Sequence, residues 1–218
     1  MKLSGILNII LGIALIGVCA FWFFSKQQET ASLLQSTADE PPSKEAIVLD
    51  NIMTRASVRA FKKDPIPDND INVLLKAGMA APTALNAQPW HFVVIRDRDM
   101  LRALADVSQY TGMLADAPLA IAVCGDMTKK ATSDEGIYWL QDCCAATENI
   151  LLAAHSMGLG ATWLGGYPVE SRYKQDIKVL KLPDNLIPVS IIAIGYPAVQ
   201  VAPKDKWHPD NVSYEPEV

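Results

Sequence analysis

Apolar residues recur along the chain at two different spacings. Recurrence every three or four residues predicts helices over 43–53, 68–79, 100–107, 137–157 and 169–179. Short uninterrupted apolar runs predict buried strands over 92–95, 119–124, 161–164 and 189–194. Ser43 can cap the first helix, and Gly158 can end the longest one. Because helices and strands alternate, the fold is predicted to be α/β or α+β.

The first 26 residues differ in pattern from the rest of the chain. Gly5 to Phe24 carries no charged side chain. At about 1.5 Å per residue, a helix of that length spans roughly 30 Å, the thickness of a hydrocarbon core. The aromatic run 21–24 followed by Lys26 is typical of a membrane interface. Residues 1–26 are therefore predicted to be an N-terminal membrane anchor or signal segment, and the protein to be membrane-anchored by an N-terminal helix.

Three interpretations of this segment remain open. An uncleaved signal anchor fits its length and flanks, whereas a cleaved signal peptide could use Val18-Cys19-Ala20 as its cleavage site. A lipoprotein would need a small residue before the cysteine, where Val18 stands. Lys2 and the α-amine precede the run, which slightly favours a domain outside the cytoplasm under the positive-inside rule.

The remaining chain divides into a polar stretch and a globular part. Residues 27–43 are polar and end in two prolines, as flexible tethers do, and 44–218 are long enough for one domain with a hydrophobic core. The net charge of −5 argues against a nucleic-acid partner. No Cys-x-x-Cys spacing of a metal site occurs. Cys143 and Cys144 would diverge by about 100° on a helix, so free thiols are predicted.

Candidate chemistry is concentrated in two segments. Arg55, Ser57 and Arg59 place two guanidiniums and a hydroxyl at alternate positions, which point to one side of an extended backbone and can converge on one oxyanion. The planar donor fork of Arg suits phosphate oxygens. The second segment, Ala81 to Trp90, is a proline-bounded turn whose amides could contact a planar heterocycle. A phosphate together with a flat ring indicates a nucleotide-like cofactor.

At these residues the chain resembles the FMN-dependent nitroreductase family. That family typically has an Arg-x-Ser-x-Arg/Lys phosphate segment, an Asn-x-Gln-Pro-Trp-His-Phe segment, a Gly-Leu-Gly junction between helix and strand, and a closing basic pair. The matching segments here follow in the same order at 55–59, 86–92, 158–166 and 204–206. The resemblance covers about residues 45–206. It implies an α+β fold with three layers (α/β/α), a mostly antiparallel sheet flanked by helices, and an intertwined homodimer with FMN at its interface.

The resemblance also implies which residues hold the phosphate end of FMN. Arg55, Ser57 and Arg59 would bind the phosphate and reach toward the pyrimidine edge of the ring. A cation at that edge stabilises the reduced flavin. Lys204 and Lys206 match the closing basic pair on the phosphate. A solvated basic loop is the alternative interpretation of both segments.

A second group of residues is implied to contact the ring. Pro82, Thr83 and Asn86 match residues that the family supplies to the isoalloxazine ring from the second subunit. Gly165 and Gly166 match the position whose backbone amides meet flavin N5 and O4, because glycine lets a backbone approach a flat ring closely. An ordinary turn after the strand is the alternative here.

The implied activity is that of an NAD(P)H-dependent oxidoreductase with a ping-pong mechanism. NADH or NADPH would reduce FMN at N5, and a small organic acceptor, a nitroaromatic or a quinone, would take the electrons afterwards. Such chemistry requires no acid, base or nucleophile from the protein. No catalytic side chain is therefore assigned, and His91 and His155 are expected to be packed or hydrogen-bonded.

Other functions stay open at this stage. A reductive dehalogenase-like flavoenzyme is one, although the segment from Gln109 to Pro118 lacks the Glu and Lys of the lid that such enzymes use, and only Tyr110 matches it. A membrane-tethered flavin-binding module without turnover is another, and a tethered scaffold without a cofactor is a third.

Overall fold

The computed structural model describes residues 17–18, 20–28, 41–131 and 136–215. The chain divides into two units, Met1–Ile47 and Val48–Val218. The first described element of the polypeptide after the tether is α2 (Lys44–Thr54). Ser43 caps it as predicted, because its Oγ accepts a hydrogen bond from the amide of Ala46 at 3.1 Å. The predicted domain boundaries at residues 26 and 43 stay predictions.

The predicted membrane location requires correction. No helix within the described ranges is both long and apolar enough to cross a bilayer, and this finding overturns the membrane-anchored localisation expected from the sequence. The helical residues 20–28 would span only roughly 14 Å, about half a hydrocarbon core. Residues 5–16 and 19 of the apolar run lie outside the described residues, as do residues 29–40 of the predicted tether.

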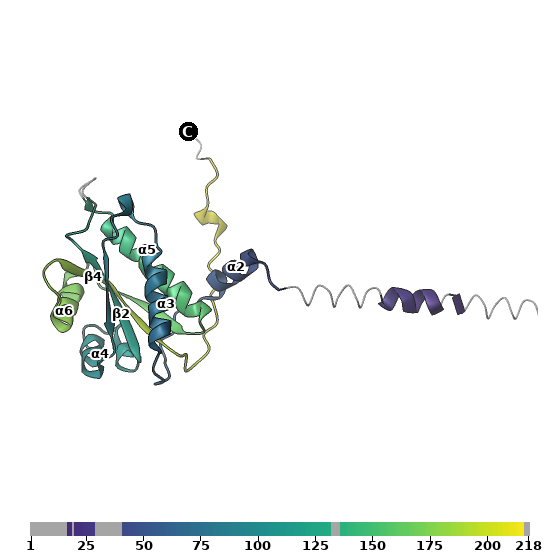
Figure 1. The fold of residues 1–218 in the computed structure, drawn as a ribbon, viewed down its shortest axis with the longest axis horizontal. Helices are drawn as coiled ribbons and strands as arrows, with labels where there is room; N and C mark the ends of the chain where they lie inside the picture. Colours follow the sequence, from purple (N-terminus) through teal and green to yellow (C-terminus); the bar gives the residue numbers. More distant parts are fainter. Residues whose placement is uncertain (1–16, 19, 29–40, 132–135, 216–218) are drawn as a thin grey trace, which may run out of the picture. The chain divides into compact units, whose positions relative to one another are not determined.

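A four-stranded antiparallel sheet forms the centre of the second unit (Figure 1). Its strands are β1 (Trp90–Ile95), β2 (Leu119–Asp126), β3 (Gly160–Gly165) and β4 (Leu186–Gly195), in the spatial order β1-β2-β4-β3. Ile121 of β2 pairs with Ile192 of β4, which pairs in turn with Trp163 of β3. β2 is buried along its whole length, which is why it forms an uninterrupted apolar run in the sequence.

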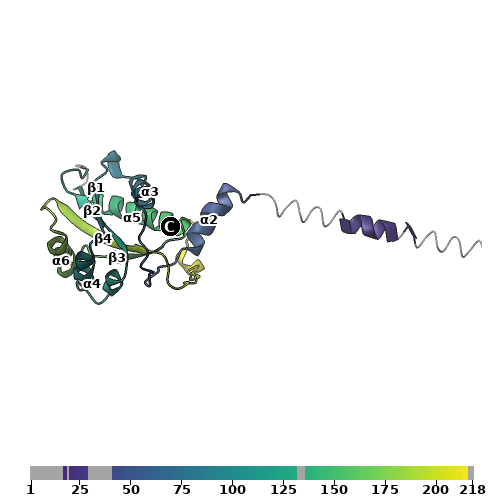
Figure 2. The ribbon, with the colours of Figure 1, turned by 60° about the horizontal axis from the view of Figure 1, so that its bottom comes forward.

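Helices cover both faces of this sheet, as Figure 2 shows. α3 (Asp68–Met79) and α5 (Trp139–Ser156) bury Leu74 and Ile150 against one face. α4 (Arg98–Ala105), the short helix η2 (Gly112–Ala115) and α6 (Glu170–Leu180) bury Leu101 and Leu180 against the other. Alternate residues of β2 and β4 enter the two cores, as a period of two requires. The predicted three-layer α+β fold is confirmed.

Two helix starts differ from the prediction. The helix expected at 100–107 is α4, which begins at Arg98 because the side chain of Asp97 accepts a hydrogen bond from the amide of Met100 at 2.8 Å. The helix expected from 137 begins at Trp139. The cysteines of the described residues, Cys124, Cys143 and Cys144, are free thiols as predicted. Cys19 lies outside those residues.

Candidate functional site

The residues predicted to bind phosphate line a cavity of about 220 Å³. One wall is formed by the segment after α2, with Arg55, Ser57 and Arg59, and the other by residues 201–206, with Lys204 and Lys206. The two walls lie almost 150 positions apart in the chain. The fold therefore brings together all five residues that the sequence suggested for phosphate binding.

The arginine segment lies at the open edge of the sheet, beside β3. The amide of Val58 donates to the carbonyl of Ala161 at 3.0 Å, and Val58 is buried. A Cβ at Gly160 would lie 2.7 Å from the Cβ of Val58, so only glycine permits this close approach. With Val58 turned into the core, the alternation of an extended backbone leaves Ser57 and Arg59 on the cavity side.

The cavity has an excess of positive charge. Arg55 is 19% exposed and its Nε lies 3.4 Å from Oε1 of Glu148. Arg59, Lys204 and Lys206 have no carboxylate within ion-pair distance among the described residues. Guanidinium, hydroxyl and ammonium donors around one small cavity form a donor set that fits a phosphate.

The predicted ring-contacting turn has a strained backbone. Leu85 and Asn86 of the short helix η1 (Ala84–Asn86) have φ of 51° and 54°, and Gln88 has φ of 49°. Non-glycine residues adopt such values only where surrounding contacts hold them. Thr83 supplies one contact, because its Oγ1 accepts a hydrogen bond from the amide of Gln88 at 3.0 Å.

A second contact on this turn comes from Asp142 of α5. Its Oδ1 accepts a hydrogen bond from the amide of Ala84 at 3.0 Å, and its Oδ2 is buried without a partner among the described residues. The sequence prediction missed Asp142, and the available signal was an acidic residue on the apolar side of a buried helix. Pro82, Thr83 and Asn86 do not line the cavity of their own chain.

The two glycines at the end of β3 differ in their surroundings. Gly165 is exposed, and the nearest atom to a Cβ placed there is Nε1 of Trp163 at 3.9 Å. Gly166 is buried, and its amide donates to the carbonyl of Val189 at 3.1 Å. Gly165 is therefore the open position of the pair, whereas the Gly166 amide is engaged within the chain.

The two histidines that the sequence analysis considered differ in their surroundings. Nε2 of His155 lies 2.9 Å from Oγ1 of Thr54, in agreement with a hydrogen-bonded histidine. His91 is exposed on β1 and its side chain has no hydrogen bond among the described residues, so the expectation that it is packed or hydrogen-bonded is wrong. Between Gln109 and Pro118 the chain forms η2, which packs through the fully buried Leu114. No cluster of metal-ligating side chains occurs within the described ranges.

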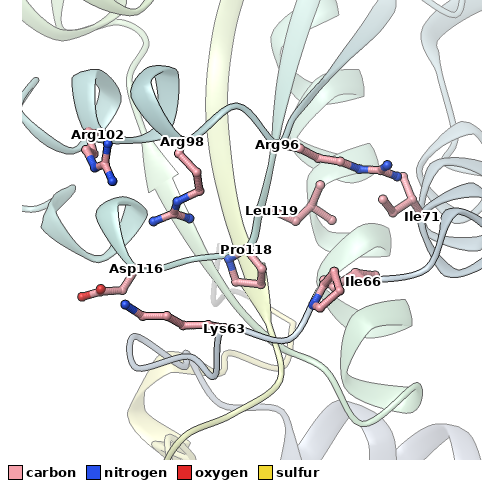
Figure 3. Close-up of a pocket in the computed structure, with 10 residues that line it drawn as sticks. Lys63, Ile66, Ile71, Arg96, Arg98, Arg102, Asp116, Pro118 and Leu119 are labelled. Atoms are coloured by element: carbon pink, nitrogen blue, oxygen red, sulfur yellow. The ribbon is translucent and has the colours of Figure 1, made fainter.

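Another cavity, of about 390 Å³, shares no residue with this site (Figure 3). Arg98, on its wall, donates to the backbone carbonyls of Ala115 and Ala117. Figure 3 shows Arg96 reaching toward Ile71, on the far side from Arg98, and Arg96 pairs there with Asp68. These arginines are thus already held by the fold.

Comparison with known proteins decides the family. The sequence model of the Nitroreductase family matches residues 52–112 and 107–196. The chain belongs to the nitroreductase family. A family member of Methanothermobacter thermautotrophicus, provisionally named NADH dehydrogenase/NAD(P)H nitroreductase, is 42% identical over 168 residues, covering 77% of this chain and 86% of that relative.

Solved structures of the family share the fold. A protein of Bacteroides thetaiotaomicron with the same provisional name is 42% identical, with a TM-score of 0.73 over 77% of this chain and 96% of that chain. A provisionally named nitroreductase of Desulfovibrio desulfuricans, solved in complex with FMN, is 30% identical, with a TM-score of 0.67 over 82% and 99% of the two chains. The predicted family, the NAD(P)H-dependent oxidoreductase class and FMN as cofactor are confirmed.

Proposed function

We propose that this nitroreductase passes electrons from NADH or NADPH through FMN to a small organic acceptor, a nitroaromatic or a quinone, in a ping-pong reaction. The cavity between residues 55–59 and 201–206 is the observation that carries the proposal, because three of its cations have no carboxylate partner among the described residues. When bound there, FMN supplies a ring that accepts a hydride and releases electrons to the second substrate. The protein itself binds the cofactor and orients the two substrates against it.

Phosphate binding is assigned to the side chains that line the cavity. Arg59, Lys204 and Lys206 supply charge that no carboxylate of the described residues neutralises, and Ser57 supplies a hydroxyl. A charge-assisted hydrogen bond contributes about 1.5–3 kcal/mol. Arg55 has one guanidinium edge beside Glu148, which fixes its direction and leaves its other N–H groups free for the phosphate or the pyrimidine edge.

The length of β3 supports the placement of the ring. Ser57 pairs with Ala161 near the start of the strand, and Gly165 ends it. Four residues of strand span roughly 13 Å. A mononucleotide lying along β3 would therefore have its phosphate at Ser57 and its ring at the exposed Gly165.

A homodimer would complete this site. Pro82, Thr83 and Asn86 lie in a strained turn away from the phosphate cavity of their own chain, and Leu85 beside them is 75% exposed. Ile52 and Met53 of α2 are also largely exposed. Such apolar side chains favour burial against a second copy. In that dimer the turn would cover the ring bound by the other subunit and exclude water from it.

The test is the visible absorption spectrum of the purified full-length chain, before and after NADH or NADPH is added without oxygen. Flavin bands that bleach, and return when a quinone or nitroaromatic is added, are expected. Bands that persist with both nucleotides would favour a flavin-binding module without turnover. Colourless protein that takes up no added FMN would overturn the proposal.

A further inference from the structure

Asp176 of α6 is a buried carboxyl that the proposed site does not use. Its side chain faces the sheet and the residue is 5% exposed. Among the described residues it has no hydrogen bond or ion pair, whereas the buried Asp126 accepts hydrogen bonds from Thr128 and Asn185 and the buried Asp142 from Ala84. Neither carboxyl oxygen of Asp176 is fully enclosed, but a largely buried carboxylate without a protein partner is unusual.

The position of Asp176 connects it to the ring end of the site. A Cβ placed on Gly166 would lie 2.9 Å from its Oδ2, so the carboxyl lies against the backbone of Gly166. Gly165, the preceding residue, is exposed at the position where the ring is proposed to lie. One peptide unit therefore separates the buried carboxyl from the surface that would contact a flavin.

The surroundings of Asp176 leave it free to change its charge near neutral pH. Burial raises its pKa to about 6, and no neighbouring charge contributes to this shift. The titratable group that senses its charge is the Cys124 thiol of β2, whose pKa burial raises to about 12 with a smaller contribution from Asp176. The other packed elements, α4 and β4, bury apolar side chains in this layer, including Leu104 and Leu186.

We propose that Asp176 is a positioning residue that acts through Gly166: its carboxylate disfavours electron density on a ring at Gly165 and thereby sets the reduction potential of bound FMN. A charge that is largely removed from water acts more strongly on its surroundings because less water screens it. Charge near the ring is a means by which proteins tune flavins. As pH rises and Asp176 ionises, the reduction potential of bound FMN therefore falls more steeply than the flavin's own proton uptake would make it fall. This inference rests on the proposed function.

The test uses the full-length protein loaded with FMN, and measures its midpoint potential between pH 5 and pH 8. Asp176→Asn removes the charge and keeps the shape. We expect its potential to exceed that of the wild type at pH 8 and the difference to shrink toward pH 5. Asp184→Asn is the matched control, because Asp184 is an exposed carboxylate in the loop after α6 and water screens it. Its profile should follow the wild type.

Superimposable profiles for flavin-loaded wild type and Asp176→Asn would overturn the inference. A purely structural Asp176 would change stability but leave the potential unchanged. If Asp176→Asn folds poorly, Asp176→Leu removes the same charge and fills the apolar layer. Carboxyl ¹³C titration of the flavin-free protein gives a readout independent of the cofactor, with a midpoint near 6 expected for Asp176. Absence of flavin from the wild type would instead count against the proposed function.

Discussion

Asp142 and Ala84 join the long buried helix to the strained turn before β1. The Ala84 amide donates to Oδ1 of Asp142 at 3.0 Å across 58 positions of sequence. Three of the four residues that follow Ala84 have positive φ, so the turn depends on contacts from outside itself. This hydrogen bond therefore controls where Asn86 and its neighbours are held.

Removing the Asp142 acceptor should loosen that turn. Asp142→Ala leaves the Ala84 amide without a partner, which costs about 1–3 kcal/mol of unfolding free energy. FMN affinity should fall as well if the turn contacts the ring. Urea unfolding and fluorescence titration with FMN measure the two effects. Asp142→Asn keeps an acceptor oxygen and should be milder in both assays; equal losses for the two variants would show that the hydrogen bond is not the cause.

Truncation of Arg59 should weaken FMN binding through the phosphate alone. The loss of a charge-assisted hydrogen bond of about 1.5–3 kcal/mol predicts a decrease in affinity of roughly 10- to 150-fold for Arg59→Ala. Riboflavin, which lacks the phosphate, should bind the variant and the wild type equally. Lys62→Ala, a neighbouring cation that does not line the cavity, is the control. An equal effect on both flavins would place the phosphate elsewhere.

The two glycines after β3 should respond differently to a methyl group. Gly166→Ala places a Cβ 2.9 Å from Asp176 Oδ2 in a packed layer and should destabilise the fold by about 1–3 kcal/mol. At Gly165 the nearest atom is 3.9 Å away, so Gly165→Ala should keep its thermal stability. It should nevertheless lose flavin affinity because the ring could no longer approach the backbone. Melting temperature and flavin retention, measured together, separate the two positions.

Stability should depend on pH through Asp176. Burial raises its folded-state pKa to about 6, above the unfolded value of about 3.9. The contribution of this carboxyl is therefore most favourable below about pH 4 and is lost as pH rises through 6. At pH 8 the buried, ionised Asp176 lowers the free energy of unfolding by on the order of 3 kcal/mol. Asp176→Leu should accordingly gain more unfolding free energy at pH 8 than at pH 5 in urea titrations; a gain independent of pH would contradict this assignment.

Local pattern was sufficient for most of the elements and for picking out five residues that line one cavity. Apolar runs located the cores of the four described strands, most clearly β2 and β4, because strands buried on both faces have no polar alternation to obscure them. The start of α4 was misplaced by two residues, although Asp97 carried a usable capping signal. The apolar N-terminal run led to a membrane location that the described helices do not support.

Long-range packing decided what local pattern could not. Asp142 and Asp176 look like ordinary helical acids in the sequence, since nothing nearby in the chain shows that one meets a turn 58 positions away and the other the glycine at the end of β3. Both are recognisable only after α5 and α6 have packed on the sheet, when burial makes an acid either a required partner or an unpaired charge.

By itself, the sequence determined the alternation of helices and strands, because this depends on residue type and spacing. Through the resemblance that its motifs carry, it also indicated the family, the three-layer class, and the arginine and lysine segments proposed to bind phosphate. Only the tertiary structure decided that residues 55–59 lie beside β3, across one cavity from residues 201–206. It also decided that Gly165 is exposed whereas Gly166 is buried. Those relationships arise from contacts between distant segments, which the hydrophobic core brings together and which no local propensity encodes.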